Sequence, residues 1–340
     1  MNRAVKYGNV LVTGASGFLA GRMSKIFVEM DLFEHLLATS RSDIRSQEFK
    51  DRGIDFIGGD CLDVNHCERI CRDIDIVVHC AALSSPWGKY IDFYNSNVAI
   101  TRNLLEAAKT VGVKKFIFIS TPGVYFNFHS RLNVSEFDTL PSRPANSYAA
   151  TKLMAEKLVL ENNQPDFGTI ALRPRAIIGA EDTVILPRLI RAHEAGKLKI
   201  IGSGKNIVDM TNVTNVVEAV ICCIESEPEV YGQAYNITNG DPVELWAAIN
   251  YTLRELGYKE VQKKISRRLA MMAAFVDENL HRYILKNTEP VLTRYGISVL
   301  SDNFTLNINK SRKLLGYQPK SDTKAGIDEY INWHKAKKWK

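Results

Sequence analysis

Tyr148 and Lys152 have the side-chain types and the spacing needed for proton transfer. They lie in the run Ser147-Tyr148-Ala149-Ala150-Thr151-Lys152. The alanines and the apolar residues behind them predict a helix, and residues four apart on a helix point the same way. A tyrosine normally loses its proton near pH ~10. We expect the Lys152 cation to lower the pKa of Tyr148, so that the phenol can act as a general acid or base.

The same pattern fits a surface lysine beside a packed tyrosine, so the surrounding elements must decide. Residues 10–13 are predicted to form a buried strand, and a helix follows to about residue 30. Between them lies Gly14-Ala15-Ser16-Gly17-Phe18-Leu19-Ala20-Gly21. Gly14 permits a tight turn and Gly17 lets the backbone approach a pyrophosphate, which the helix N-terminus attracts with its N–H groups and dipole. This segment predicts a dinucleotide site made by Gly14, Ser16, Gly17, Phe18 and Leu19.

Strand-like apolar runs alternate with helical patterns through the first half of the chain. Strands are expected at residues 36–39, 56–58, 76–79, 115–119 and 169–172, and the clearest helix at 92–111. This alternation predicts an α/β fold with a Rossmann-like, doubly wound parallel sheet.

The residues after the second and third strands bear on which dinucleotide binds. The second strand ends in Thr39-Ser40-Arg41-Ser42, without the acidic residue that holds the ribose of NAD. Arg41, helped by Ser40, could hold a 2′-phosphate instead, which favours NADP and leaves NAD open. Asp60, next to Cys61, could accept from the adenine or cap the next helix.

The fourth strand is predicted to end in small residues that let a cofactor lie close. These are Ala81 and Ala82, two positions beyond His79. We expect His79 to be a packed strand residue rather than a catalyst.

Composition excludes several other classes of protein. The chain has 340 residues, 45% of them hydrophobic, and a net charge of +6, which predicts a large core and no nucleic-acid partner. Its last basic residues, Lys335, Lys337, Lys338 and Lys340, are expected to be a solvated helix end. Six cysteines without a Cys-x-x-Cys pair predict free thiols and no metal site. No secretion signal or long apolar run is visible, so we expect a cytoplasmic protein.

One set of motifs, taken together, is specific. It comprises Thr13-Gly14-x-x-Gly17-Phe18, Gly59-Asp60, His79-x-Ala81-Ala82, Asn97-Val98, Ser120-Thr121-Pro122, Tyr148-x-x-x-Lys152, Leu172-Arg173-Pro174-Arg175 and Leu315-Gly316-Tyr317-Gln318-Pro319. In this order the motifs resemble the extended short-chain dehydrogenase/reductase superfamily over nearly the whole chain. Within it, the chain is most similar to the 3β-hydroxysteroid dehydrogenase branch, which includes 2-alkyl-3-oxoalkanoate reductases and sterol-4-carboxylate dehydrogenases.

The resemblance assigns roles to particular residues. It implies that Tyr148 gives or takes the proton, that Lys152 assists it and binds the nicotinamide ribose, and that Thr121 polarises the substrate carbonyl, with Ser120 in reserve. It also implies cofactor contacts from Ser120, Arg173 and Pro174. Three positions depart from the family pattern: Ile100 stands where relatives often carry glycine, and Asn212 and Asn215 stand where Tyr and Asp are common.

The second half is expected to supply the substrate region. We predict a dinucleotide domain at residues 1–178, to which 206–240 return, and a mostly helical substrate or lid region at 179–205 and 241–340. Residues 268–285 carry a broad apolar, Met-rich helix face, expected to be a lid over a greasy substrate, a helix touching lipid, or an ordinary core helix. Trp87 and Pro122 are tentative substrate contacts.

The expected function is therefore NAD(P)-dependent interconversion of a 3-oxo and a 3-hydroxy group on a hydrophobic substrate. Two alternatives stay open: a nucleotide-sugar epimerase or dehydratase of the same superfamily, and a catalytically silent NADP-binding regulator. Relatives suggest a homodimer through the helices at 92–111 and 148–162.

Overall fold

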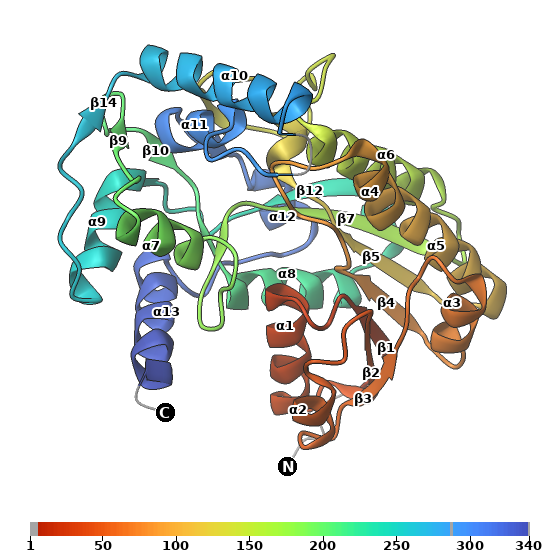
Figure 1. Ribbon diagram of the computed structural model, residues 1–340. Helices are drawn as coiled ribbons and strands as arrows, with labels where there is room; N and C mark the ends of the chain where they lie inside the picture. Colours follow the sequence, from red (N-terminus) through yellow and green to blue (C-terminus); the bar gives the residue numbers. More distant parts are fainter. Residues whose placement is uncertain (1–5, 286–287, 339–340) are drawn as a thin grey trace.

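A seven-stranded parallel sheet forms the centre of the molecule (Figure 1). The computed structural model describes residues 6–285 and 288–338. The strand order is β3-β2-β1-β4-β5-β7-β12 and every pairing is parallel. The strands are β1 (Tyr7–Thr13), β2 (Phe33–Ser40), β3 (Asp55–Gly58), β4 (Ile76–His79), β5 (Lys115–Ile119), β7 (Gly168–Pro174) and β12 (Gln233–Ile237). The Rossmann-like prediction is confirmed.

Helices cover both faces of this sheet, which is why its strands are continuous apolar runs rather than alternating ones. On one face lie α1 (Phe18–Glu29) and α8 (Val213–Glu225), with Met23, Phe27 and Val220 in a shared core. On the other face lie α3 (Val64–Cys71), α5 (Ile100–Val111) and α6 (Ser147–Glu161), which share a second core with Leu104 and Val159. The short α2 (Ser46–Lys50) precedes β3.

The helix predicted at 92–111 is not regular. It begins as α4 (Tyr90–Phe93), passes through a π-helical segment, η1 (Tyr94–Ala99), and continues as α5. The side chain of Asn97, in η1, accepts from the Leu83 amide at 2.7 Å and donates to Thr151 on α6 at 2.9 Å. The π-helical segment therefore ties the loop after β4 to α6.

A second region lies beyond the carboxyl edge of the sheet and has its own core, with Trp246, Leu253, Ile297 and Tyr330 among its members. Its helices are α7 (Leu186–Glu194), α9 (Leu245–Glu255), α10 (Arg267–Tyr283), α11 (Arg294–Ser301) and α13 (Thr323–Lys338), whereas α12 (Asn309–Leu314) packs against β12 of the main sheet. The expected helices at 186–195, 213–224 and 242–256 correspond to α7, α8 and α9. The domain boundaries themselves stay a prediction.

Short strands link the two regions. One sheet has the order β13-β10-β15-β6, and two strand pairs, β8–β11 and β9–β14, stand beside it. Their bounds are β6 (Arg131–Val134), β8 (Ile177–Ile178), β9 (Ile200–Ile201), β10 (Ile207–Val208), β11 (Thr211–Asn212), β13 (Val243–Glu244), β14 (Lys264–Ile265) and β15 (Phe304–Leu306), and the 3₁₀ turns are η2 (Pro122–Tyr125) and η3 (Pro228–Val230). Only the strand of β9 was expected from the sequence.

Three compositional expectations can be placed on the fold. None of the helices in the described ranges is both long and apolar enough to cross a membrane. All six cysteines are free, and the described residues contain no cluster of potential metal ligands. Helix α13 carries the basic tail as far as Lys338, and Lys340 lies outside the described residues.

Candidate active site

A cavity of about 390 Å³ opens at the carboxyl edge of the sheet, where β1 to β4 end. Parallel strands bring these ends together, and open α/β sheets bind their ligands there. The cavity is lined by the predicted cofactor residues Gly14, Ser16, Gly17, Ser40, Arg41, Asp60, Cys61, Ala81 and Ala82. The structure thus brings together residues from four separate strand ends.

The glycine turn fits a dinucleotide because there is no room for side chains in it. Gly14 has φ +75°, and a Cβ there would lie 2.8 Å from the backbone N of Ala81. The N-cap Gly17 makes no side-chain cap, so the first amides of α1 face outward with the positive end of the helix dipole. The turn, the dipole and the nearby hydroxyls suit a pyrophosphate.

Phe18 and Leu19 differ from the prediction in how they take part. Phe18 is buried and Leu19 packs against the core below the sheet, and neither side chain lines the cavity. What they offer to a dinucleotide is the backbone of the first helical turn.

The end of β2 is rich in hydroxyls and carries one exposed cation. Ser40 donates to the carbonyl of Ser42 at 2.6 Å, which shapes the turn. Arg41 is exposed and lines the cavity beside both serines. The Asp60 carboxylate accepts from the Leu62 amide at 2.9 Å and also lines the cavity.

Tyr148 and Thr121 meet at the next strand end along the sheet. Helix α6 begins there because Asn146 accepts from the Ala149 amide at 2.8 Å. The hydroxyls of Thr121 and Ser84 lie close enough to Tyr148 to oppose the rise that burial causes in its pKa, and the Thr121 hydroxyl accepts from the Gly123 amide at 3.1 Å. A phenol and a hydroxyl placed together in this way can bind one carbonyl oxygen.

The expectation that Lys152 lowers the pKa of Tyr148 is wrong. Burial raises the pKa of Tyr148, its bonds to Thr121 and Ser84 oppose that rise, and Lys152 does not contribute. Burial also lowers the pKa of Lys152, to about 7. Its amine donates to the carbonyl of Ile119 at 2.6 Å and lies 3.9 Å from the ring centroid of Phe118. The spacing rule places both residues on one face, but it neglects the cost of burying a charge.

Beneath this pair lies a buried ionic network that the sequence analysis missed. Glu156, four residues after Lys152, accepts from Ser120 at 2.5 Å and from Nε of Arg173 at 2.8 Å. A second guanidinium nitrogen of Arg173 also bonds Glu156, and a third bonds Tyr125. The spacing Tyr148, Lys152, Glu156 could have revealed this polar stripe.

Two residues predicted to contact the cofactor are hydrogen-bonded within the protein. The guanidinium of Arg173 is held by Glu156 and Tyr125, so it is not available to a dinucleotide, and the Ser120 hydroxyl is committed to Glu156. Both are supports for the site. Pro174 ends β7 in register with Ile237 and is buried.

His79 is a packed strand residue, as expected. Its ring bonds Thr13 at 2.7 Å and Thr101 at 2.9 Å, and burial lowers its pKa to about 3, so it stays neutral. Thr13 in turn accepts from the Ala81 amide at 3.2 Å. This chain of bonds braces the cavity wall between β1 and β4.

The apolar face of α10 points outward. Ala270, Ala274 and Glu278 are its buried residues, so it packs with its small side chains. The exposed large apolar residues are Leu269, Met272, Phe275, Val276, Leu280 and Tyr283, followed by Ile284 and Leu285. Three roles were predicted for residues 268–285. The prediction of an ordinary core helix is wrong, because the large apolar side chains are exposed.

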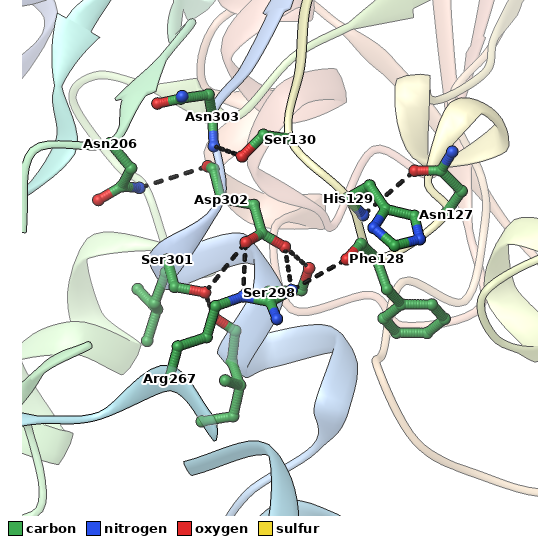
Figure 2. A network of polar contacts seen from close by, with 12 residues as sticks. Asn127, Phe128, His129, Ser130, Asn206, Arg267, Ser298, Ser301, Asp302 and Asn303 are labelled. Atoms are coloured by element: carbon green, nitrogen blue, oxygen red, sulfur yellow. Dashed lines mark hydrogen bonds and ion pairs between the residues drawn. The ribbon is translucent and has the colours of Figure 1, made fainter. Parts of the chain in front are cut away.

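An ion pair anchors the start of α10. Figure 2 shows Arg267 facing the Asp302 carboxylate, with nitrogen–oxygen distances of 2.7 and 2.8 Å, while a further bond of 2.9 Å reaches the carbonyl of Phe128. Ser298 and Ser301 bond the same carboxylate. At the other end of α10, Arg282 lies 6.0 Å from the ring of Trp87.

The other residues singled out in the sequence can also be placed in the structure. Pro122 is buried at the start of η2. Asn212 caps α8, and Asn215 accepts from the Lys320 amide at 2.9 Å, so both fasten the segment before α13. Ile100 lines the dinucleotide cavity, where glycine would leave more room.

Comparisons with known proteins agree with this geometry. Residues 11–267 match the model of the 3-beta hydroxysteroid dehydrogenase/isomerase family. The chain is 32% identical to a 4-hydroxy-2-methyl-3-oxo-4-farnesyl-3,4-dihydroquinoline-1-oxide ketoreductase of Stigmatella aurantiaca, over 93% of this chain and 94% of the relative. It is 31% identical to a 2-alkyl-3-oxoalkanoate reductase of Stenotrophomonas maltophilia, over 94% and 97% of the two chains.

A solved structure supports the fold. The UDP-glucuronic acid 4-epimerase of Bacillus cereus in complex with NAD superposes with a TM-score of 0.73 and 23% identity, over 96% of both chains. At that identity the likeness concerns the fold alone. Family match, relatives and site agree: the chain belongs to the 3-beta hydroxysteroid dehydrogenase/isomerase family and is a dinucleotide-dependent oxidoreductase.

Proposed function

We propose that the protein reduces the 3-oxo group of a hydrophobic substrate to a hydroxyl, with NADPH as the reductant. The observation that carries this proposal is the grouping of the Tyr148, Thr121 and Ser84 hydroxyls, since Thr121 and Ser84 oppose the rise that burial causes in the pKa of Tyr148 and Ser84 follows Ala82 of the cavity lining by two residues. Lys152 is also close to that cavity, because its charge acts on Cys80, which lines it.

The residues of the site divide the work on the carbonyl oxygen. The dinucleotide, when bound, supplies the hydride. Tyr148 holds its proton at neutral pH because burial raises its pKa, so it can donate to the oxygen as negative charge develops there. Thr121 donates a second hydrogen bond to the same oxygen. Lys152 holds the end of β5 through its bond to the Ile119 carbonyl. Because its pKa is about 7, its amine can take up or release a proton near neutral pH.

Arg41 supports NADPH over NADH. It is the exposed cation of the cavity, beside the hydroxyls of Ser40 and Ser42, and β2 ends without an acidic residue. We expect Arg41→Ala to raise the KM for NADPH roughly 10- to 100-fold, as loss of a charge-assisted bond does, and to leave the KM for NADH unchanged. Equal KM values for NADPH in both proteins would refute this role.

The substrate class follows from the family and from the relatives, whose names describe a 2-alkyl-3-oxoalkanoate reductase and a ketoreductase acting on a farnesylated ring. We test it by NADPH consumption against long-chain 3-oxo acids, 3-oxosteroids and UDP-glucose. Turnover of the first two classes is expected. Isomerisation of UDP-glucose without net NADPH consumption would instead favour an epimerase.

We further propose that the exposed face of α10 lies against an anionic lipid surface that presents the substrate. The face is made of large apolar side chains, and its exposed charges are the cations Arg268 and Arg282. Asp277 is engaged by His281, and Glu278 is buried against Arg294. Apolar area flanked by arginines is the combination that binds lipid headgroups.

The homodimer stays a prediction. Tyr90 and Ile91 on α4 and Met154 on α6 are exposed, and the Tyr90 hydroxyl lies 3.4 Å from the sulfur of Met154. These neighbours would form part of a shared helical interface. Sedimentation of the wild type and of Ile91→Asp tests it, with a monomeric wild type as the contrary result.

A further inference from the structure

Arg175, the residue after β7, is held in place by its backbone. Its amide donates to the carbonyl of Ile237 at 3.1 Å, and its own carbonyl accepts from the Thr211 hydroxyl. The next residue, Ala176, has φ +44°, a left-handed conformation that a residue with a Cβ adopts only under constraint. The fold therefore sets the direction of the Arg175 side chain.

The guanidinium of Arg175 has no polar partner within residues 6–285 and 288–338. Its Nε is buried without a hydrogen bond, and its planar group lies 5.1 Å from the ring centroid of Phe304. Arg173, two residues earlier, has all three guanidinium nitrogens bonded. Since a buried donor without a partner is costly, the contrast indicates that Arg175 is kept for a ligand.

The Asp209 carboxylate, whose charge acts on Arg175, forms no ion pair with it. Asp209 accepts from the Leu306 amide at 2.6 Å, and the Thr238 side chain lies close enough to oppose the rise that burial causes in its pKa. Burial raises the pKa of Asp209 to about 6, and the charge of Arg175 opposes that rise without an ion pair being formed. Arg175 therefore keeps its donors for another anion.

Tyr295 links Arg175 to the catalytic pair. The charge of Arg175 acts on the Tyr295 hydroxyl, and Tyr295 in turn acts on Tyr148. A Cβ built on Gly123 would lie 3.8 Å from the Tyr295 hydroxyl and 3.2 Å from Oγ1 of Thr121. The Tyr295 hydroxyl thus lies near both the proton donor and the guanidinium of Arg175.

An aromatic cluster holds these groups. Phe126 lies 4.9 Å from the ring of Tyr295 and 5.6 Å from the ring of Phe304, centroid to centroid. The guanidinium of Arg175 lies over the ring of Phe304. Tyr295 and Arg175 are therefore positioned by one rigid unit, as a binding site requires.

We propose that Arg175, with Tyr295, binds an anionic oxygen group of the substrate a few bonds from the carbonyl that Tyr148 protonates. A guanidinium fork matches a carboxylate in two parallel bonds. This inference rests on the proposed reductase function and narrows its substrate to a keto acid. A phosphate offers the same oxygen chemistry, so the experiment separates the two sources.

The first measurement compares a 3-oxo fatty acid with its methyl ester in NADPH-dependent reduction. We expect the wild type to prefer the acid. Arg175→Gln should lower kcat/KM for the acid roughly 10- to 100-fold, as the loss of a hydrogen-bonded ion pair does, and leave the ester within about twofold. Arg175→Lys should recover part of the loss, and Arg143→Gln, an exposed arginine, none of the effect. Equal losses for acid and ester would overturn the proposal.

The second measurement needs no turnover. Calorimetry measures the binding of decanoate, decanol and UDP-glucose to the wild type and to Arg175→Gln. Weaker binding of decanoate alone supports the carboxylate site, even if no ketone is reduced, in which case the reductase proposal fails by itself. Weaker binding of UDP-glucose alone overturns the keto-acid assignment in favour of a phosphate. Equal binding of all three probes by both proteins overturns the anion site.

Discussion

The core of the active site and helix α10 treat polar and apolar side chains in opposite ways. Around α6 and β7, the charged groups Lys152, Glu156 and Arg173 are buried and bonded to one another or to the backbone. On α10, by contrast, large apolar residues such as Met272 and Val276 are exposed. Buried charges need defined partners, whereas an exposed apolar face needs only a surface. The first region is therefore specified within the chain, and the second by what it meets.

The largest effect is expected where the site acts on the carbonyl. Tyr148→Phe removes the proton donor and should lower kcat about 1,000-fold or more, at the upper part of the usual range for acid–base catalysis. Affinity for NADPH should be unchanged, because the cavity residues are untouched. Steady-state kinetics and fluorescence titration measure the two. Tyr90→Phe, on the exposed α4, is the matched control, and substantial turnover by Tyr148→Phe would contradict the assigned role.

The next test breaks the buried network. Glu156→Ala leaves Arg173 buried and unpaired and should cost about 3–5 kcal/mol of unfolding free energy. Urea denaturation measures it. Glu161→Ala, exposed at the end of α6, should change stability by less than about 0.5 kcal/mol. Equal stabilities of the two variants would show that the network contributes little.

The exposed face of α10 gives a test with the opposite signature. Val276→Asp should leave unfolding free energy nearly unchanged, because the side chain is 64% exposed. Its partitioning onto vesicles of anionic phospholipid should fall about tenfold or more, since one buried apolar side chain contributes about 1.5–3 kcal/mol. Leu132→Asp, exposed on β6, is the control for surface charge. If the wild type does not sediment with such vesicles, the lipid proposal is wrong.

The last test concerns pH. Because burial lowers the pKa of Lys152 to about 7, the unfolded chain binds a proton that the folded chain releases between about pH 7 and the ordinary lysine pKa near ~10.4. The stability of the wild type relative to Lys152→Met therefore rises with pH across this window. Melting temperatures at pH 6 and pH 10 measure the difference, which should favour the variant most at pH 6. Lys157→Met, exposed on the same helix, should show no such trend.

Much of the dinucleotide half could be predicted from the sequence because it depends on local signals. Apolar runs between turns marked the core strands, and Gly14 and Gly17 marked a backbone approach that a Cβ would block. Tyr148 and Thr121 followed from a family pattern and do meet in the fold.

The rest depends on contacts between distant segments. Tyr295 lies near Tyr148 although 147 positions separate them in the sequence, and no sequence pattern predicts this contact. Arg173 and Arg175 look alike in the sequence, and only the structure shows that one is paired and the other is not. For α10, the apolar stripe predicts that one face of the helix is buried. It does not tell whether another part of the chain or an external surface buries it.

The tether made by Asn97 has a mechanical consequence. One amide side chain holds the Leu83 backbone, just beyond the cavity wall, and the Thr151 hydroxyl, one residue before Lys152. The Asn97 side chain thus joins the loop after β4 to helix α6 by hydrogen bonds, so the two sides of the reaction cleft move together. Thermal fluctuation should change the gap between hydride donor and proton donor less than it displaces either one.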